Sequence, residues 1–221
     1  MTLAAAIIPV TPFQQNCTLI WDDETKDGVV VDPGGDADRI QEAIHQAGVK
    51  VQRILLTHGH LDHAGAAAEL AQALGVPIEG PHRADAFLLD GLPEQGAKYG
   101  MACLPVAPDR WLDEGESVQI AGHDFEVLHC PGHTPGHVVF VNTDLGFALV
   151  GDVLFQGSVG RTDFPYGDTA ALIAAIRGKL FPLGDDIQLA AQEGWIKHGI
   201  SPKDTRGRGL SPPHPVCRKP A

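Results

Sequence analysis

Short apolar runs alternate with helical patterns over the first half of the chain. Runs typical of strands cover residues 6–10, 17–21, 28–32 and 51–56. Apolar residues recur with the helical period over residues 40–47, which predicts a helix with Asp36 as its N-cap and Gly48 at its end. An alanine-rich stretch over residues 63–74 predicts a second helix that ends at Gly75.

The pattern is weaker beyond residue 77, where residues 83–90 predict a helix within a long surface excursion. Strand patterns resume at residues 117–120, 124–128, 137–141 and 147–150, and residues 169–180 predict a last amphipathic helix. Runs of strands with interspersed helices indicate an α/β domain built in layers. At 221 residues the chain fits one such domain better than two.

The composition is that of a globular protein, with 43% hydrophobic and 20% charged residues. A net charge of −12 argues against sequence-independent binding to nucleic acid or to an anionic membrane. No apolar run approaches the ~18 residues of a membrane span, and residues 1–10 lack the basic start of a signal peptide. The four cysteines form no CxxC pair and no disulfide framework. We therefore expect a cytoplasmic protein, whose oligomeric state the sequence does not fix.

Charge and proline content change sharply near residue 197. Residues 197–221 contain six Lys or Arg, one Asp and five prolines, without any apolar period. Such a composition indicates a solvated, poorly ordered segment. We therefore expect one domain over residues 1–196, with a net charge of −17, followed by a basic, Pro-rich tail over residues 197–221.

Two groups of histidines come directly after predicted strands. THGHLDH (residues 57–63) follows the run at 51–56, and HCPGHTPGH (residues 129–137) follows the run at 124–128. A third polar position, Asp152, comes after the run at 147–150. The polar side chains thus gather at strand ends, where loops commonly carry binding and catalytic residues.

The spacing of the first group suits metal binding. In an extended His-x-His segment, His58 and His60 point to the same side of the chain, where two neutral imidazoles can bind one ion. Asp62 and His63 follow as the backbone turns into a helix, so they can serve a neighbouring ion. Burying such groups unpaired would cost several kcal/mol each, so packing alone gives no reason to collect them. The sequence therefore predicts metal ligands at these positions, for a cation such as Zn²⁺, Fe²⁺ or Mn²⁺.

The second group needs to supply only one ligand to complete such a site, and its other histidines can hydrogen-bond around it. Cys130 could be a thiolate ligand, but the role of a small buried thiol in the core is favoured. His45, His82 and His123 fall in a helix, a loop and a turn, and we expect them to be solvated.

Together these motifs resemble the metallo-β-lactamase superfamily, whose signature is H-x-H-x-D-H. The fit is best with its glyoxalase II-like branch, the hydroxyacylglutathione hydrolases, and especially with short bacterial members that have no helical glutathione-binding domain. The segments that carry the resemblance are THGHLDHAG (57–65), PGHTPGH (131–137), Gly151-Asp152 and GSVGRTD (157–163). It covers roughly residues 5–187 and implies an α/β fold, an αββα sandwich of two mixed sheets with helices on the outer faces.

The resemblance also implies a set of metal ligands. They are His58, His60 and His133 for a first ion, Asp62 and His63 for a second, and Asp152 as a bridge between the two. Asp62 would also act in catalysis by orienting the reactive water. His137 would hydrogen-bond around the site without binding a metal. One or two Zn²⁺ ions are expected, with Fe or Mn as alternatives.

The chain departs from this family near its C-terminal end. A further histidine, in a Gly-His-Gly turn after the last helix, normally completes the second metal site, and residues 181–195 contain no such turn. By length, Glu193 falls where that histidine belongs, and His198 is the nearest alternative. Because the change coincides with the basic, Pro-rich tail, we hypothesise an out-of-frame or replaced ending, which the coding DNA would test. A missing ligand predicts weaker occupancy of the second site.

The activity implied is hydrolysis of a small-molecule thioester derived from glutathione. A metal-bound hydroxide would attack the carbonyl of an S-2-hydroxyacylglutathione, such as S-D-lactoylglutathione, and release D-lactate and glutathione. A thiolate leaves readily, so no general acid is required. The substrate-binding residues are not fixed. Arg161, Tyr166 and Lys179 could contact the substrate, although ordinary surface roles are favoured for each.

Four alternatives remain to be compared. A β-lactamase is disfavoured because Asp152 stands where lactamases usually carry Cys or Ser and because no export signal is visible. A mononuclear iron persulfide dioxygenase gains support from the missing ligand. A nucleic-acid-processing relative is disfavoured by the acidic domain. The last alternative is a metal-binding protein whose altered C-terminal end has impaired turnover.

Overall fold

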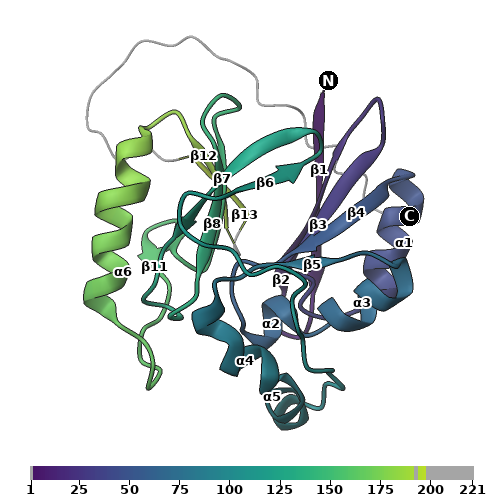
Figure 1. The fold of residues 1–221 in the computed structure, drawn as a ribbon, viewed down its shortest axis with the longest axis horizontal. Helices are drawn as coiled ribbons and strands as arrows, with labels where there is room; N and C mark the ends of the chain where they lie inside the picture. The colour runs from purple at the N-terminus through teal and green to yellow at the C-terminus, as the bar shows by residue number, and fades with distance from the viewer. Residues whose placement is uncertain (1, 192–193, 198–221) are drawn as a thin grey trace.

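Two mixed β-sheets pack face to face in the computed structural model, which describes residues 2–191 and 194–197 (Figure 1). The first sheet, in the order β1-β2-β3-β4-β5, consists of β1 (Leu3–Val10), β2 (Gln15–Asp22), β3 (Asp27–Val31), β4 (Lys50–Leu55) and β5 (Ile78–Glu79). The second, in the order β13-β12-β9-β8-β7-β6, consists of β6 (Ser117–Ile120), β7 (His123–His129), β8 (Val138–Asn142), β9 (Phe147–Gly151), β12 (Gln188–Ala191) and β13 (Gly194–Lys197). A separate short hairpin joins β10 (Leu154–Phe155) and β11 (Ser158–Val159).

Helices cover the outer faces of both sheets (Figure 1). The first sheet is covered by α1 (Ala37–Ala47) and α3 (Ala67–Leu74), and the second by α6 (Thr169–Ala175), which continues as a π-helical turn, η2 (Ile176–Leu180). The other helical segments are α2 (Leu61–Ala64), η1 (Arg83–Asp85), α4 (Ala86–Asp90), α5 (Leu92–Tyr99) and η3 (Phe181–Leu183). This arrangement confirms the αββα sandwich. Among the described residues no helix has both the length and the apolar character needed to cross a membrane.

Three apolar layers hold the sandwich together, one between the sheets and one under each set of helices. Neighbouring residues of a strand enter different layers. Ile20 packs between the sheets, whereas Leu19 packs outward with Ile40 of α1. Phe140 and Val139 of β8 divide in the same way, inward and toward α6. Because both faces of these strands are buried, they appear in the sequence as continuous apolar runs.

The expected strands of both halves form, and the expected helix over residues 40–47 lies within α1 and ends at Gly48. Asp36 stands at the N-cap position of α1, as predicted, but its side chain makes no cap hydrogen bond. Its backbone is left-handed (φ 51°), and its side-chain oxygen accepts a hydrogen bond from the Thr11 N–H at 2.8 Å. The side chain therefore joins the β1–β2 turn to the start of α1 instead of satisfying the helix end.

The alanine-rich stretch at residues 63–74 is not one helix but α2 and α3 with a break at Gly65 and Ala66. Here the loop after β3 passes close to the helix. A Cβ on Gly65 would lie 2.5 Å from the Gly34 carbonyl oxygen, and the Ala66 N–H donates to the Pro33 carbonyl at 2.9 Å. The break lets backbone atoms of the two segments meet, and this contact places the helix that carries Asp62 and His63.

Candidate metal centre

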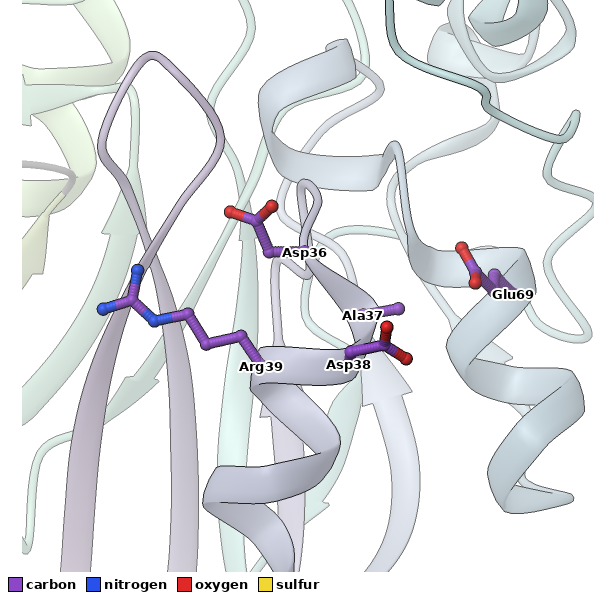
Figure 2. Close-up of a pocket in the computed structure, with 5 residues that line it drawn as sticks. All are labelled: Asp36, Ala37, Asp38, Arg39 and Glu69. Atoms are coloured by element: carbon purple, nitrogen blue, oxygen red, sulfur yellow. The ribbon is translucent and has the colours of Figure 1, made fainter. Parts of the chain in front are cut away.

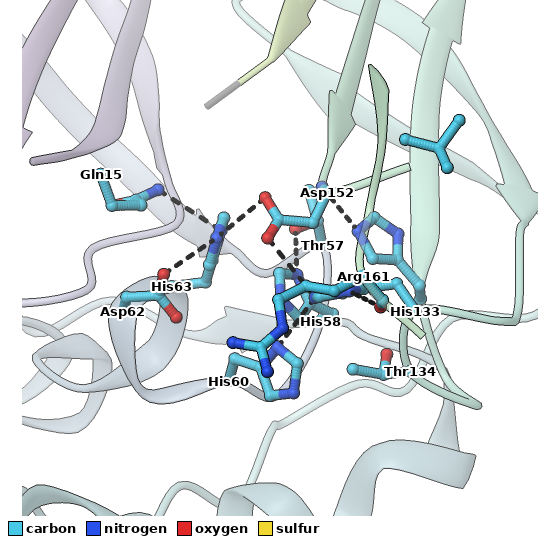
Figure 3. A network of polar contacts seen from close by, with 12 residues as sticks. Gln15, Thr57, His58, His60, Asp62, His63, His133, Thr134, Asp152 and Arg161 are labelled. Atoms are coloured by element: carbon cyan, nitrogen blue, oxygen red, sulfur yellow. Dashed lines mark hydrogen bonds and ion pairs between the residues drawn. The ribbon is translucent and has the colours of Figure 1, made fainter. Parts of the chain in front are cut away.

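Strand ends from both sheets carry the two histidine motifs to one place. β3 and β4 run parallel, so Asp32 and residues 57–63 leave the first sheet side by side. The second motif follows β7, and Asp152 follows β9, so both leave the second sheet. Figure 3 shows side chains from these segments converging on one another: His58, His60, Asp62, His63, His133 and Asp152.

Three buried histidines from these segments face each other, and we call them the three-histidine group: His58, His60 and His133. Nε2 of His58 lies 3.1 Å from Nδ1 of His60. Nε2 of His133 lies 2.9 Å from the same Nδ1. Each ring thus turns one nitrogen toward a common point.

The outward nitrogens of this group have partners of their own. Nδ1 of His133 lies 2.8 Å from the Arg161 carbonyl oxygen, which can only accept. Nδ1 of His58 lies 3.1 Å from the Thr57 hydroxyl, whose proton is donated to Asp32. These partners hold the N–H of both rings on Nδ1, so the inward Nε2 atoms are bare lone pairs.

Nε2 of His60 lies 2.8 Å from the Tyr166 hydroxyl. Its other ring nitrogen, Nδ1, faces the Nε2 lone pairs of His58 and His133. Even a proton on Nδ1 of His60 could bond to only one of the two nitrogens that face it. A cation shared by the three nitrogens would satisfy all of them, and imidazole nitrogens are common ligands of a four-coordinate Zn²⁺.

A second group lies beside the first and consists of His63, Asp62 and Asp152 (Figure 3). Nδ1 of His63 lies 2.9 Å from the Asp32 carboxylate, so it carries the proton. Nε2 of His63 then faces Oδ1 of Asp152 at 3.3 Å and Oδ2 of Asp62 at 3.8 Å. Within the part of the chain that the structure describes, Nε2 of His63 and Oδ1 of Asp152 are buried without a hydrogen-bond partner.

Asp152 lies between the two groups. Oδ1 faces His63, and Oδ2 lies 3.4 Å from Nε2 of His133. The backbone N–H of Asp152 donates to Nε2 of His137 at 3.0 Å, which fixes the start of the loop after β9. One carboxylate oxygen is therefore directed at each group, the geometry that a bridging ligand needs.

Burial and neighbouring charges set the protonation of these side chains. Burial lowers the pKa of His60 to about 3 and that of His58 well below its ordinary value, and the surrounding imidazoles act in the same direction. Burial would also lower the pKa of His63, but Asp152, Asp62 and Asp32 raise it overall. Burial opposes ionisation of Asp152, yet its pKa lies below the usual range because His63 stabilises the carboxylate. The three-histidine group is neutral at pH 7, the form that binds metal.

The donor set fits a divalent cation of the zinc, iron or manganese type. It combines imidazole nitrogens with carboxylate oxygens, and two of these atoms, Nε2 of His63 and Oδ1 of Asp152, are buried and unsatisfied among the described residues. Leaving such atoms unpaired is costly, so the arrangement is explained by an ion that they share.

The remaining histidine and cysteine candidates lie around the site or away from it. His137 is buried and stacks on His58 at 4.6 Å, and His129 donates to the Pro135 carbonyl. The Cys130 thiol is buried, and burial raises its pKa to about 12.

Other candidates lie away from the site. His45 is exposed and His123 is half-buried. Glu193 and His198, the proposed replacements for the last ligand, lie outside the described residues.

Three residues at the site were not assigned from the sequence. Asp32 accepts hydrogen bonds from His63 and Thr57. It ends the predicted strand at 28–32, as the other site residues stand at strand ends, so this signal could have found it. Asp85 accepts hydrogen bonds from both histidine loops, but it does not stand at the end of a predicted strand, so the sequence gives no sign of its role. Tyr166 was expected at the surface, but its hydroxyl contacts His60.

Aromatic side chains border the three-histidine group. Tyr166 stacks on Phe164, with ring centroids 5.3 Å apart, and contacts Phe87 edge to face. Arg161 lies over the Phe164 ring and pairs with Asp163, the surface role that was favoured for it. This apolar border, with one cation beside it, is suited to hold an organic substrate against the site.

A surface hollow at the start of α1 contains none of the site residues. Its lining consists of Asp36, Ala37, Asp38, Arg39 and Glu69 (Figure 2). The three carboxylates spread around its rim, and Arg39 points to one side. The hollow therefore adds nothing to the chemistry described above.

The chain belongs to the metallo-β-lactamase superfamily, whose family model matches residues 10–191. Within that superfamily it falls in the glyoxalase II-like branch and is an enzyme of the metallo-hydrolase type. The hydroxyacylglutathione hydrolase GloC of Haemophilus influenzae is 52% identical over 190 residues, which are 85% of this chain and 89% of the relative.

Two solved structures share the fold over most of their length. BLEG-1, described as a B3 metallo-β-lactamase, has a TM-score of 0.79 and 32% identity, over 87% of this chain and 93% of the other. TTHA1623, solved in a di-iron-bound form, has a TM-score of 0.78 and 34% identity, over 88% of this chain and 96% of the other. These likenesses agree with a His/Asp metal site in this fold and leave the identity of the metal open.

Proposed function

We propose that this protein is a metal-dependent thioester hydrolase that acts on S-2-hydroxyacylglutathione, for example S-D-lactoylglutathione, and releases D-lactate and glutathione. The observation that carries the proposal is the meeting of three imidazole nitrogens. Nδ1 of His60 lies 3.1 Å from Nε2 of His58 and 2.9 Å from Nε2 of His133, and the protons of His58 and His133 are held on the outer side. The substrate class is supported by the similarity to the hydroxyacylglutathione hydrolase of Haemophilus influenzae.

The ligands of the proposed metals divide between the two groups. They are His58, His60 and His133 for the first ion, Asp62 and His63 for the second, and Asp152 as the bridge. Zn²⁺ suits this set of nitrogen and oxygen donors, with Fe and Mn as alternatives. Because the second ion has fewer ligands among the described residues, we expect it to bind more weakly than the first.

Bound at this site, a divalent ion lowers the pKa of a coordinated water toward ~7 and polarises the thioester carbonyl. Asp62 lies at the more open side of its group, with 23% of its side chain exposed. Its Oδ2 can accept a hydrogen bond from the attacking water and orient it toward the carbonyl carbon. Asp32 keeps the proton of His63 on Nδ1, away from the reacting groups.

The substrate would lie against the aromatic border of the site. Phe164 and Tyr166 shield His60 from solvent, and Phe87 is 49% exposed beside them. These rings would exclude water from the acyl group, and Arg161 would attract a carboxylate of the glutathione moiety. The thiolate leaves without a proton donor because its conjugate thiol has a pKa near ~8.5.

The test is thioester hydrolysis by purified protein, measured together with its metal content. We expect hydrolysis of S-D-lactoylglutathione that is lost on chelation and restored by added Zn²⁺. Oxygen uptake on glutathione persulfide with bound iron, without thioester hydrolysis, would instead establish the dioxygenase alternative. A metal-loaded protein that turns over neither substrate would be the impaired metal-binding protein.

The cytoplasmic location stays a prediction, as does the absence of nucleic-acid and membrane partners. The basic tail at residues 197–221 falls almost entirely outside the described residues, so its order and its origin as an out-of-frame ending also stay predictions.

A further inference from the structure

A single buried carboxylate joins the two histidine loops. Asp85 ends η1, far along the chain from both motifs, and its side chain is fully buried. Oδ2 accepts hydrogen bonds from the Gly59 N–H at 2.9 Å and from the Thr134 hydroxyl at 2.7 Å. Oδ1 accepts from the Gly136 N–H at 2.5 Å. All three donors belong to the histidine loops.

The positions of these donors matter for the proposed first metal site. Gly59 lies between His58 and His60, whereas Thr134 directly follows His133. The carboxylate therefore spans the two loops whose imidazoles form the three-histidine group. Hydrogen bonds to a charged acceptor are stronger than neutral ones, and low polarity around a buried carboxylate strengthens them further.

Two glycines allow this close approach. A Cβ on Gly136 would lie 2.6 Å from the Asp85 nitrogen and 2.7 Å from its carboxyl carbon. A Cβ on Gly59 would lie 2.8 Å from the Leu88 Cβ and 3.3 Å from the Asp85 Cβ. Both loops are thus shaped around the segment that presents Asp85, and a side chain at either glycine would push them away from it.

We propose that Asp85 is a positioning residue that sets the distance between the His58–His60 loop and the His133 loop, and so the affinity for the first metal. The inference rests on the proposed function only in taking these three histidines as metal ligands. Asp85 does not itself reach the metal or the substrate. It acts through the backbone on either side of the ligands.

Asp85→Asn isolates this role because it keeps the shape of the side chain. The amide has only one acceptor oxygen, and its NH₂ must face at least one of the N–H groups of Gly59 and Gly136. The Thr134 hydroxyl can turn to accept from the amide, but a backbone N–H cannot. One loop therefore loses its anchor in this variant.

Asp22→Asn is the matched control. Asp22 is also buried, and its Oδ1 accepts from the backbone N–H groups of Glu24 and Thr25 at 3.0 and 2.7 Å, in the turn after β2. It accepts hydrogen bonds from backbone N–H groups, as Asp85 does, but touches neither histidine loop, and both of its bonds go to one oxygen that the amide keeps. The cost of removing a buried negative charge is therefore shared by both variants, whereas only Asp85→Asn loses a loop anchor.

The experiment measures the Zn²⁺ affinity of the first equivalent by competition with a chromophoric chelator, the absorption spectrum of the Co²⁺-substituted protein, and the melting temperature of the metal-free protein. We expect Asp85→Asn to weaken the first equivalent by about 10–100-fold and to change the Co²⁺ spectrum. Asp22→Asn should lower the melting temperature alone. Wild-type affinity and spectrum in Asp85→Asn, or equal loss of affinity in both variants, would overturn the inference.

Thr134→Val provides a second test if Asp85→Asn does not fold. It removes one of the three donors and leaves the carboxylate in place, so we expect a smaller loss of Zn²⁺ affinity, of roughly 3–10-fold. Unchanged affinity in a folded Thr134→Val protein would count against the inference. Because metal binding is measured directly, wild-type protein that binds Zn²⁺ but hydrolyses no thioester would refute the proposed function and not the role of Asp85.

Discussion

Each imidazole at the site is oriented by the group bound to its outer nitrogen. The acceptor is a backbone carbonyl for His133, a hydroxyl backed by Asp32 for His58, and a carboxylate for His63. Such partners fix both the tautomer and the plane of the ring. His133 differs from His129, which also bonds a backbone carbonyl, because its second ring nitrogen lies 2.9 Å from Nδ1 of His60.

His133→Ala and His129→Ala form a matched pair within one motif. His133→Ala should lower thioester hydrolysis by at least about 100-fold and reduce bound metal, because loss of a direct ligand exceeds the 10–100-fold effect of outer partners. The ring of His129 donates to the Pro135 carbonyl and stacks on His82, away from the three-histidine group, so His129→Ala should keep metal and activity. Equal loss of metal in both variants, measured by elemental analysis, would contradict this assignment.

Cys130→Ala decides between a thiolate ligand and a core residue. The thiol is buried with Val139 and Val150, and burial raises its pKa to about 12, so it stays protonated at pH 7. We expect an unchanged metal content and a loss of about 1–2 kcal/mol in the free energy of unfolding, from the small cavity left behind. Urea denaturation and metal analysis check this, and loss of metal would support the thiolate role.

The sequence predicted the side chains that gather at the site better than the groups that position them. His58, His60, Asp62 and His63 stand close together in one motif, so their shared purpose is visible from spacing alone. Asp85 is an isolated acidic residue in the sequence. Its role arises from the fold, which brings it under two loops at once.

At the scale of elements, close backbone contacts decide where the ligands lie. A Cβ on Gly34, in the loop after β3, would lie 1.6 Å from the Asp62 carbonyl oxygen at the start of α2. The loop and the helix can meet only if that position has no side chain. The break between α2 and α3 has the same cause, which is why helical periodicity alone predicted one continuous helix.

Gly34→Ala should therefore move the segment that carries Asp62 and His63. We expect a loss of about 1–3 kcal/mol in the free energy of unfolding, as in other overpacked sites, together with weaker binding of the second metal. Gly178→Ala in η2 is the control, because a Cβ there meets no heavy atom within 4 Å. Urea denaturation and metal titration compare the two, and a Gly34→Ala protein with full stability and metal content would refute the argument.

The elements that the sequence pattern did not predict, α5 and β5, share a physical reason. α5 contains Pro93 and Gly96, which weaken any helical signal, although the proline stands in the first turn where it is tolerated. β5 has two residues and is held by its parallel neighbour β4. Tertiary contacts stabilise such elements, so their own sequences reveal little.

At the scale of the whole molecule, the three-histidine group links the two halves of the sandwich. His58 and His60 follow β4 of the first sheet, whereas His133 follows β7 of the second. An ion bound by all three would therefore connect the sheets at one end of their interface. Binding to the folded state alone also stabilises that state by mass action.

Removing the metal should therefore lower the melting temperature of the protein, and not only its activity. An ion present at about 100 times its dissociation constant contributes about 2.7 kcal/mol, and for a chain of this size each kcal/mol corresponds to roughly 2–4 °C. We expect chelation to lower the melting temperature by about 5–10 °C and added Zn²⁺ to restore it. His133→Ala is the control, because the link between the sheets is already broken and chelation should change its melting temperature little. A wild-type melting temperature that stays constant while bound metal and activity disappear would show that the ion does not join the two sheets.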